Sequence, residues 1–242
     1  MSVIVAAIRS LATYVTVSLY VLIMGPPFLV IALMTGSPMI LYRVGLIGVR
    51  IGLFLSGISY RVEHSDRIQR HRAAVYAVNH TSNVEPPILF DVFHELFPRL
   101  RIVYKAELRK LPILVRAFDL GGFVPLERGN PDQSLPAIDG AATALREGNS
   151  FLIFPEGTRS RTGALLPFKK GGFIMALKGQ APIVPVAISG ARNAMRKGSP
   201  LIYPVQVRVQ LGTPVETAGR SHEDRDKLIA EVRGQIERML ST

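Results

Sequence analysis

Residues 10–42 contain no charged side chain, and this stretch of 33 residues constrains the fold more than any other feature of the chain. It is rich in Val, Ile, Leu and Phe, and moving an ionised side chain into hydrocarbon is costly. The 182 residues from Arg61 onward carry all 18 acidic residues and 26 of the 29 Lys and Arg. This division predicts a membrane-embedded arm, residues 1–60, joined to one globular domain, residues 61–242.

The arm is too long to cross a membrane as one straight helix. A helix of residues 10–42 would be about 50 Å long, whereas the hydrocarbon core is about 30 Å thick. A Gly-Pro-Pro sequence at residues 25–27 interrupts helix hydrogen bonding, so we expect two segments of about 22 Å each. With Arg9 and Arg43 at the two ends, a helical hairpin inserted from the cytoplasmic face is favoured over a kinked span or a signal peptide.

Composition limits both the chemistry and the partners. The chain has no Cys, which excludes disulfides, thiolate nucleophiles and Cys-ligated zinc, so any chemistry must come from His, carboxylates or hydroxyls. A net charge of +11 beside a membrane arm predicts attraction to anionic lipid first, with an acidic carrier protein as a second candidate. No nucleic acid partner is expected, because the chain has no Trp and no interleaved aromatic and basic residues.

Beyond Tyr60, strand-like and helix-like stretches alternate. Short β-branched or aromatic runs predict strands at residues 73–78, 101–104, 151–154, 183–189 and 205–211. Helices are expected at residues 86–97, 134–147, 169–180 and 221–240. Ser221 and Asp224 have the spacing of a capping box at the start of the last helix. The alternation predicts an α/β fold whose mixed sheet is flanked by helices.

The sequence NHTSNVEPPILF, residues 79–90, follows the first predicted strand and carries His80 and Glu85. Pro86 and Pro87 suit the first turn of the next helix, and the residue before a proline avoids the α region, so we expect Glu85 outside that helix. A loop folded over a helix start can bring the two side chains together, although regular helix would place them about 140° apart. A carboxylate on one imidazole nitrogen leaves the other nitrogen as a base. The alternative is a loop histidine that bonds only to its own backbone.

A second polar sequence, FPEGTRS at residues 154–160, follows the strand-like FLIF. α/β sheets place ligand sites at this end of their strands. Glu156 can accept a hydrogen bond from a substrate hydroxyl, and Arg159 can bind a phosphate through paired N–H donors. The alternative is a tight turn with a surface salt bridge.

Together these sequences resemble the glycerolipid acyltransferase family, specifically the lysophosphatidic acid acyltransferases. Four blocks occur in the family's order: NHTSNVE at 79–85, GGFVPLERG at 121–129, FPEGTRS at 154–160 and APIVPVAI at 181–188. Two further segments, KAEL at 105–108 and PFKKGGF at 167–173, are also similar to family sequence. The family's first block is H-x4-D, whereas here the acid is Glu85, one methylene longer, which can shift the position of the base.

The resemblance implies transfer of a fatty acyl group from acyl-CoA or acyl carrier protein to the sn-2 hydroxyl of lysophosphatidic acid, without an acyl-enzyme. In this scheme His80 is the base, Glu85 stabilises the imidazolium, and backbone N–H groups near Gly157 receive the oxyanion. The substrate-binding residues implied are Lys105, Arg128, Glu156, Gly157, Thr158 and Arg159, with Arg128 and Arg159 foremost for the phosphate. No metal or organic cofactor is expected, and the domain should face the cytoplasm at head-group depth.

Three alternatives stay open at this point. The same chemistry can act on another lysophospholipid or lipid hydroxyl; a lipid hydrolase would use water instead; and a non-catalytic membrane adaptor would need no base. A serine hydrolase is disfavoured because the chain has no G-x-S-x-G sequence. Asp91, a nearby spare acid, is expected to be structural because it lies inside a predicted helix.

Overall fold

A seven-stranded mixed sheet forms the centre of the computed structural model, which describes residues 3–110, 112–126 and 131–242. The strand order is β1-β7-β6-β2-β5-β3-β4. All neighbouring strands are parallel except β6 and β7, which are antiparallel. The strands are β1 (Ser59–Glu63), β2 (Val75–Val78), β3 (Leu100–Lys105), β4 (Val124–Leu126), β5 (Ser150–Ile153), β6 (Ile183–Ser189) and β7 (Gln206–Leu211).

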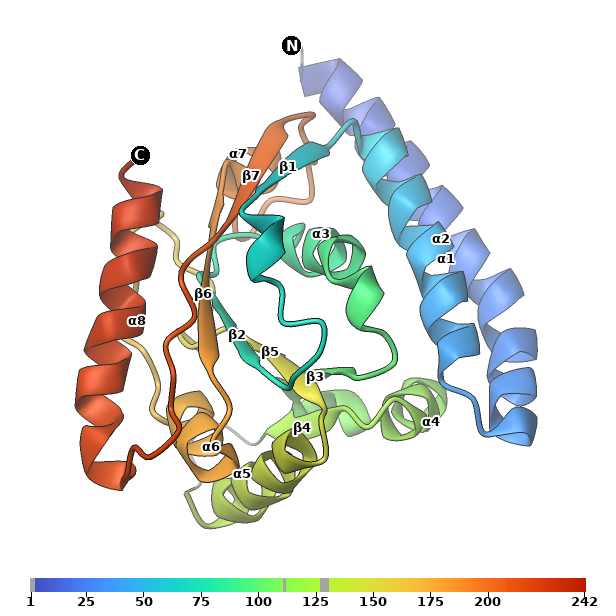
Figure 1. The fold of residues 1–242 in the computed structure, drawn as a ribbon. Coiled ribbons are helices and arrows are strands. Elements are labelled where there is room, and N and C mark those ends of the chain that lie inside the picture. Colours follow the sequence, from blue (N-terminus) through green and yellow to red (C-terminus); the bar gives the residue numbers. More distant parts are fainter. Residues whose placement is uncertain (1–2, 111, 127–130) are drawn as a thin grey trace.

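Helices cover both faces of this sheet (Figure 1). The α-helices of the domain are α3 (Glu85–Val92), α4 (Pro112–Leu120), α5 (Pro131–Arg146), α6 (Gly171–Gly179), α7 (Ala191–Ala194) and α8 (Arg225–Leu240). Short 3-10 helices are η1 (Ser65–Arg67), η2 (His94–Leu96), η3 (Ala106–Lys110) and η4 (His222–Asp224).

The two faces of strand β2 belong to two hydrophobic clusters. Tyr76 and Val78 pack with α3, whereas Val75 and Ala77 pack with α5, α6 and α8. All four side chains are fully buried. Because side chains alternate across a strand, a strand covered on both faces must be apolar throughout. The polar residues that follow β2 therefore emerge abruptly at its carboxyl end.

The predicted α/β fold is confirmed, with differences in detail. All five predicted strands and the capping box at Ser221 and Asp224 are present. The helix expected at residues 86–97 is instead α3 followed by η2. Sequence analysis missed β1, β4, α4 and α7, which are short or lack clear periodicity and depend on neighbouring elements to form.

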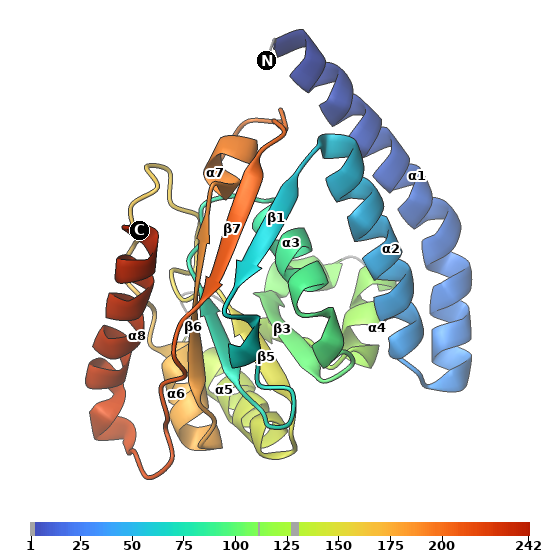
Figure 2. The same cartoon turned by 45° about the horizontal axis from the view of Figure 1, so that its top comes forward.

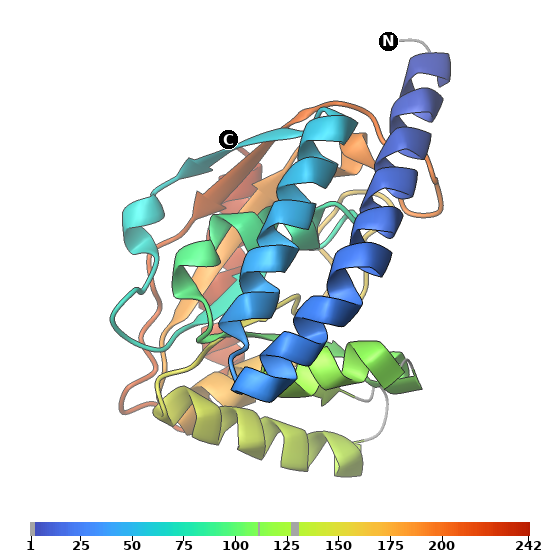
Figure 3. The ribbon, with the colours of Figure 1, turned by 90° about the vertical axis from the view of Figure 1, so that its right-hand side faces the viewer.

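The arm is a pair of antiparallel helices, α1 (Val3–Thr35) and α2 (Met39–Ser56), that lie side by side against the domain (Figures 2 and 3). Both are long and apolar enough to cross a membrane, which indicates membrane association. The predicted break at residues 25–27 is wrong, because α1 continues through Pro26 and Pro27 and the chain turns at residues 36–38. Each proline removes one helical hydrogen bond. In an apolar environment no water is present to bond the other backbone groups if the helix opens, so the helix persists.

Polar contacts fasten the arm to the domain. Arg50 of α2 donates to the carboxylate of Asp91 in α3 (Nε to Oδ1, 3.0 Å), so Asp91 has the structural role that the sequence predicts. At the other side, the Tyr14 hydroxyl of α1 donates to the carbonyl of Pro200 over 2.8 Å. Since Pro200 lies in the loop between α7 and β7, the arm contacts two segments that surround the carboxyl edge of β2.

Candidate active site

His80 and Glu85 come together at the carboxyl end of β2. The Nδ1 atom of His80 lies 2.6 Å from Oε2 of Glu85. Glu85 is the first residue of α3, so the expectation that it lies outside the helix is wrong by one position. Pro86 and Pro87 follow it in the first turn, where the missing N–H groups would have no helical partner anyway.

The carboxylate of Glu85 is fully buried and is held by its own loop. It accepts hydrogen bonds from the backbone N–H of Thr81 (2.9 Å), the hydroxyl of Thr81 (2.6 Å) and the N–H of Ser82 (3.0 Å). A carboxylate beside Nδ1 keeps the ring proton on that nitrogen and leaves Nε2 with its lone pair. The loop therefore fixes both the tautomer and the orientation of His80.

A second loop, residues 154–170 between β5 and α6, supports the histidine from the other side. The imidazole stacks on the ring of Phe154, with centroids 4.0 Å apart. The N–H of His80 donates to Oε1 of Glu156 (2.6 Å), and its carbonyl accepts from the N–H of Ser160 (2.8 Å). The side chain of His80 is 17% exposed, so the ring is supported yet open to a substrate.

Glu156 is structural in this arrangement, contrary to the prediction that it binds a substrate hydroxyl. Its Oε2 accepts from the N–H of Leu166 (2.8 Å) while Oε1 accepts from His80, and the residue is only 2% exposed. Burial raises the pKa of Glu156 above its usual range, because the loss of solvation outweighs these two hydrogen bonds. Sequence reasoning did not foresee that two backbone amides from different segments would meet this carboxylate.

Gly157 adopts a positive φ of +67°, which a residue with a side chain seldom tolerates. Its N–H donates to the carbonyl of Phe154 (2.9 Å), so among the backbone N–H groups near Gly157 that were expected to receive the oxyanion, this one is already engaged. The N–H groups of Thr158 and Arg159 have no acceptor within the described part of the chain. The Arg159 side chain is half-buried and likewise makes no hydrogen bond or ion pair with described residues.

Two other predicted phosphate ligands cannot be placed. Arg128 lies outside the described residues, and of Lys105 only the backbone, at the end of β3, is described. Among the residues that the structure describes, no three His, Asp or Glu side chains gather in a way that would hold a metal ion.

Three residues that sequence reasoning passed over hold the site together. The Asn79 side chain bonds both to the carbonyl (3.0 Å) and to the N–H (2.7 Å) of Ile188 in β6. The Ser82 hydroxyl donates to the carbonyl of Met195 over 2.7 Å. The ammonium of Lys197 donates to the Thr158 hydroxyl (3.2 Å) and to the Arg159 carbonyl (3.0 Å). Only the surplus of cations in this part of the sequence hinted at Lys197.

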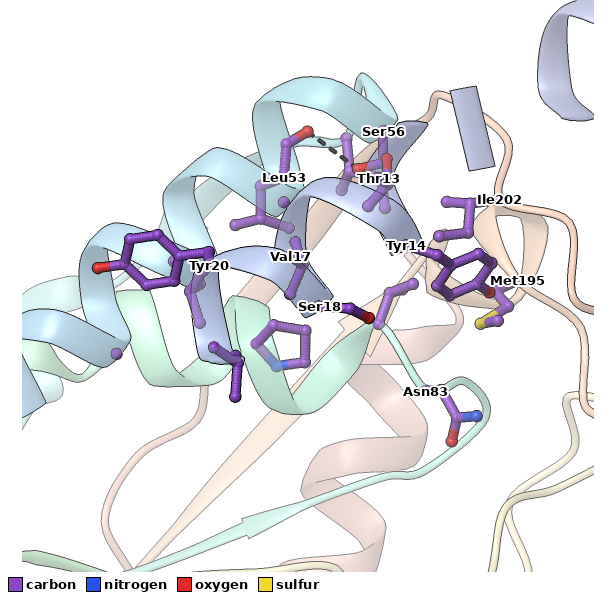
Figure 4. Close-up of a pocket in the computed structure, with 18 residues that line it drawn as sticks. Thr13, Tyr14, Val17, Ser18, Tyr20, Leu53, Ser56, Asn83, Met195 and Ile202 are labelled. Carbon is purple, nitrogen blue, oxygen red and sulfur yellow. Dashed lines mark hydrogen bonds between the residues drawn. The ribbon is translucent and has the colours of Figure 1, made fainter. Parts of the chain in front are cut away.

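An apolar pocket of about 410 Å³ opens beside the His80 loop. Helices α1 and α2 form two of its walls, and Asn83 and Val84 of the His80 loop and Met195 and Ile202 of the α7–β7 loop form others (Figure 4). On α2, Gly48 leaves room for Tyr20, since a Cβ atom there would lie 2.8 Å from the tyrosine ring. The close packing of α1 on α2 thus shapes the pocket.

A His–carboxylate pair at the carboxyl edge of an α/β sheet, with a cation and free amides opposite, suits acyl transfer to a hydroxyl. A family model described as Acyltransferase matches residues 59–189, so the chain belongs to the acyltransferase family and is an enzyme. The resemblance noted in the sequence is thereby confirmed.

Known relatives extend this comparison. The 1-acyl-sn-glycerol-3-phosphate acyltransferase of Limnanthes douglasii is 32% identical over 197 residues, which cover 78% of this chain and 67% of that protein. The enzyme of the same name from Borreliella burgdorferi is 28% identical over 194 residues, covering 80% and 76%. The crystal structure of the 1-acyl-sn-glycerophosphate (LPA) acyltransferase PlsC from Thermotoga maritima has a TM-score of 0.82 at 24% identity, over 100% of this chain and 98% of that one. The fold, arm included, is therefore shared.

Proposed function

We propose that this acyltransferase transfers a fatty acyl group from an acyl thioester to the sn-2 hydroxyl of lysophosphatidic acid and so makes phosphatidic acid for phospholipid synthesis. The contact that carries the proposal is the 2.6 Å distance between His80 Nδ1 and Glu85 Oε2, in a loop that leaves the ring accessible. The names of the relatives support lysophosphatidic acid as the acceptor.

The His80 loop supplies a base for this reaction. Nε2 of His80 takes the proton of the acceptor hydroxyl while the hydroxyl oxygen attacks the thioester carbonyl carbon. Glu85 stabilises the resulting imidazolium, as its contact with Nδ1 allows. When the tetrahedral intermediate collapses, the carbon–sulfur bond breaks, and the departing thiolate takes the proton from Nε2. The ester forms without an acyl-enzyme.

The tetrahedral intermediate carries a negative charge on the former carbonyl oxygen. The N–H groups of Thr158 and Arg159 are the best candidates to receive it, because the N–H of Gly157 is engaged with Phe154. Lys197 bonds to this same segment and adds positive charge beside it. The Thr158–Arg159 segment would therefore supply backbone dipoles, and Lys197 of the α7–β7 loop would supply a cation held beside them.

The phosphate of the acceptor is assigned to Arg159, whose guanidinium has no partner in the described part of the chain. A planar guanidinium binds phosphate through two parallel N–H donors, and such bonds are among the stronger ones in water. Arg128, Lys105 and Thr158 remain in the proposed substrate-binding set on the basis of the family resemblance.

The acyl chain belongs in the apolar pocket between the arm and the domain. Its volume of about 410 Å³ and its lining suit a hydrocarbon chain, and its wall includes residues directly before Glu85. This placement keeps lipid substrates at head-group depth, with the domain on the cytoplasmic face. The proposed partners are membrane lipids, the lysophospholipid and a thioester carrier, either CoA or acyl carrier protein, with no nucleic acid and no bound cofactor.

The test is acyl transfer from radiolabelled oleoyl-CoA by detergent-purified protein, with parallel acceptors. Lysophosphatidic acid, lysophosphatidylcholine, lysophosphatidylethanolamine, lysophosphatidylglycerol and no acceptor are compared, and oleoyl acyl carrier protein serves as a second donor. Labelled phosphatidic acid alone supports the proposal. Label in another phospholipid would change the acceptor, and label in free fatty acid without acceptor would indicate a hydrolase.

A further inference from the structure

A second cavity, of about 550 Å³, lies on the loop between α7 and β7. Each of its four lining residues carries a polar group, unlike most residues of the apolar pocket; they are Asn193, Arg196, Ser199 and Tyr203. The guanidinium of Arg196 is exposed and makes no hydrogen bond or ion pair with any residue that the structure describes. A cavity of this size that combines a cation, an amide and an aromatic ring fits a small polar ligand with anionic and planar parts.

The cavity is held in shape by backbone bonds and by one of its own side chains, since the Ser199 hydroxyl accepts a hydrogen bond from the N–H of Leu201 (3.2 Å). The N–H of Tyr203 donates to the carbonyl of Ala194 over 2.8 Å and closes the loop at its base. Helix α1 braces the same loop, since the Ser10 hydroxyl accepts from the N–H of Ile202 over 2.7 Å. The side chains of Asn193, Arg196 and Tyr203 make no hydrogen bond with the described residues, so these three can contact a ligand without any change in the loop.

This loop is also part of the active site. The carbonyl of Met195 accepts a hydrogen bond from the Ser82 hydroxyl of the His80 loop. The ammonium of Lys197 donates hydrogen bonds to the Thr158–Arg159 segment. Met195 and Ile202 line the apolar pocket (Figure 4), while the residues around them line the polar cavity. One amphiphilic molecule with its chain in the apolar pocket and its reactive carbonyl at His80 would pass along this loop.

The charge of the surrounding segment favours a polyanion. Residues 148–215 contain nine Lys and Arg but a single acid, Glu156, which is buried and bonded to two backbone amides. Lys178 is paired with Asp139 outside this segment, but Arg192, Arg196 and Lys197 in and beside the α7–β7 loop form no ion pair with any described residue, and such cations attract phosphate groups. The donor of the reaction is the substrate whose carrier can combine several phosphates with an aromatic base.

We propose that the polar cavity binds the nucleotide part of an acyl-CoA donor. Arg196 binds its phosphate groups, the ring of Tyr203 packs against the adenine face, and the Asn193 amide bonds to the base edge. This inference rests on the proposed function, because it assigns the donor of that reaction. An acyl carrier protein would instead bind through its acidic surface to the Lys and Arg side chains around the cavity and would leave the cavity itself unfilled.

The kinetic test compares two donors that carry the same acyl thioester. Oleoyl-CoA has the nucleotide, whereas S-oleoyl-pantetheine lacks it together with all phosphates. In the full-length protein, Arg196→Gln should raise the KM for oleoyl-CoA about tenfold, as expected for the loss of one charge-assisted contact, and should leave kcat and the KM for lysophosphatidic acid unchanged. The KM for S-oleoyl-pantetheine should not change.

Arg161→Gln is the matched control, since it removes the same charge from an exposed side chain of the same basic segment outside the cavity. It should leave both donors unaffected. An unchanged KM for oleoyl-CoA in Arg196→Gln, an equal rise with S-oleoyl-pantetheine, or a rise in the KM for lysophosphatidic acid instead, would each overturn the inference.

A binding measurement separates this inference from the proposed function. Adenosine 3′,5′-bisphosphate carries the base and phosphates without acyl group or thiol, so its binding by calorimetry needs no turnover. The wild type should bind it, Arg196→Gln and Tyr203→Leu should weaken binding about tenfold, and Arg161→Gln should not. Binding in a protein that transfers no acyl group would sink the proposed function alone, whereas no binding, or equal binding in all variants, would sink the cavity assignment alone.

Discussion

The loops that follow β2 and β5 each bury one glutamate beside His80, and the two glutamates serve different purposes. Glu85 is 0% exposed and takes its donors from within its own loop, at Thr81, Ser82 and the ring of His80. Glu156 is 2% exposed and takes its donors from two separate segments, at the N–H groups of His80 and Leu166. One carboxylate orients a side chain, and the other joins backbones.

The difference shows that burial and residue type do not define the role of a carboxylate. The role depends on which hydrogen-bond donor the carboxylate meets. A carboxylate that faces a ring N–H changes the protonation behaviour of that ring, whereas one that faces backbone amides fixes the position of the loops. Substitutions in the two loops should therefore affect different observables, with the first loop changing kcat and the second changing stability or substrate affinity.

The largest effect is expected from His80→Ala. The substitution removes the base, so transfer to lysophosphatidic acid should fall by about 10³-fold or more in kcat. The fold should persist, because the ring is partly exposed and because Glu85, which loses its His80 contact, keeps its hydrogen bonds from Thr81 and Ser82. Radiolabel transfer and circular dichroism would measure both properties, with the exposed His71→Ala as control. Retained transfer in folded His80→Ala protein would rule out the dyad.

Glu85→Gln should come next, with kcat lower by about 10²-fold and an unchanged KM for lysophosphatidic acid. The amide lacks the charge that stabilises the imidazolium. It also replaces one acceptor oxygen with an NH2 group, which cannot accept hydrogen bonds from the N–H groups of Thr81 and Ser82. Glu85→Asp keeps the charge and should retain more activity than Glu85→Gln in the same assay. Equal rates in the two variants would mean that the charge of the first loop contributes nothing to catalysis.

Arg159→Ala should raise the KM for lysophosphatidic acid about tenfold with little change in kcat, because it removes a phosphate contact that persists through the reaction. A monoacylglycerol acceptor, which lacks the phosphate, should show no such rise. Arg161→Ala, two residues further along an exposed segment, is the control. An unaltered KM in Arg159→Ala would remove this residue from the phosphate site.

The smallest effect is expected for Glu156→Gln, which should change the free energy of unfolding. The direction of this change with pH is the informative result. Burial raises the pKa of Glu156, so the folded protein keeps a proton that the unfolded chain has already lost. The wild type should therefore lose stability as pH rises from about 4.5, the usual value, through the raised pKa, and the Gln variant should lack that contribution.

Unfolding in detergent, followed between about pH 5 and 8, checks this expectation. The stability of Glu156→Gln relative to the wild type should improve as pH rises. If it worsens instead, the two amide bonds to the carboxylate outweigh its burial, and the second loop depends on charge as the first one does.

Local sequence was sufficient to predict the His80–Glu85 pair, because only four residues lie between the partners and the two following prolines mark the helix start. It was not sufficient for Glu156 or Gly157. Their partners, the His80 N–H and the Phe154 carbonyl, depend on how the strand ends meet and on the backbone turn at Gly157. The substrate role expected for Glu156 followed from its place in the motif alone.

The arm shows the same limit at larger scale. The absence of charges over residues 10–42 indicated membrane association, but the turn lies at residues 36–38 and not at the prolines. Helix α2 begins at Met39 and continues beyond the uncharged stretch to Ser56, and its Arg50 donates to Asp91 of α3. That contact joins residues 41 positions apart, so the sequence of the arm alone does not reveal it.

The sequence by itself determined the apolar arm, the alternating elements of an α/β fold and the His–carboxylate motif, since these depend on periodicity and on neighbours along the chain. Only the tertiary structure decided where the hairpin turns, which amides Glu156 accepts, and how the α7–β7 loop separates an apolar pocket from a polar cavity. Those features depend on contacts between residues far apart in sequence, and such contacts exist only after the sheet has brought the strand ends together.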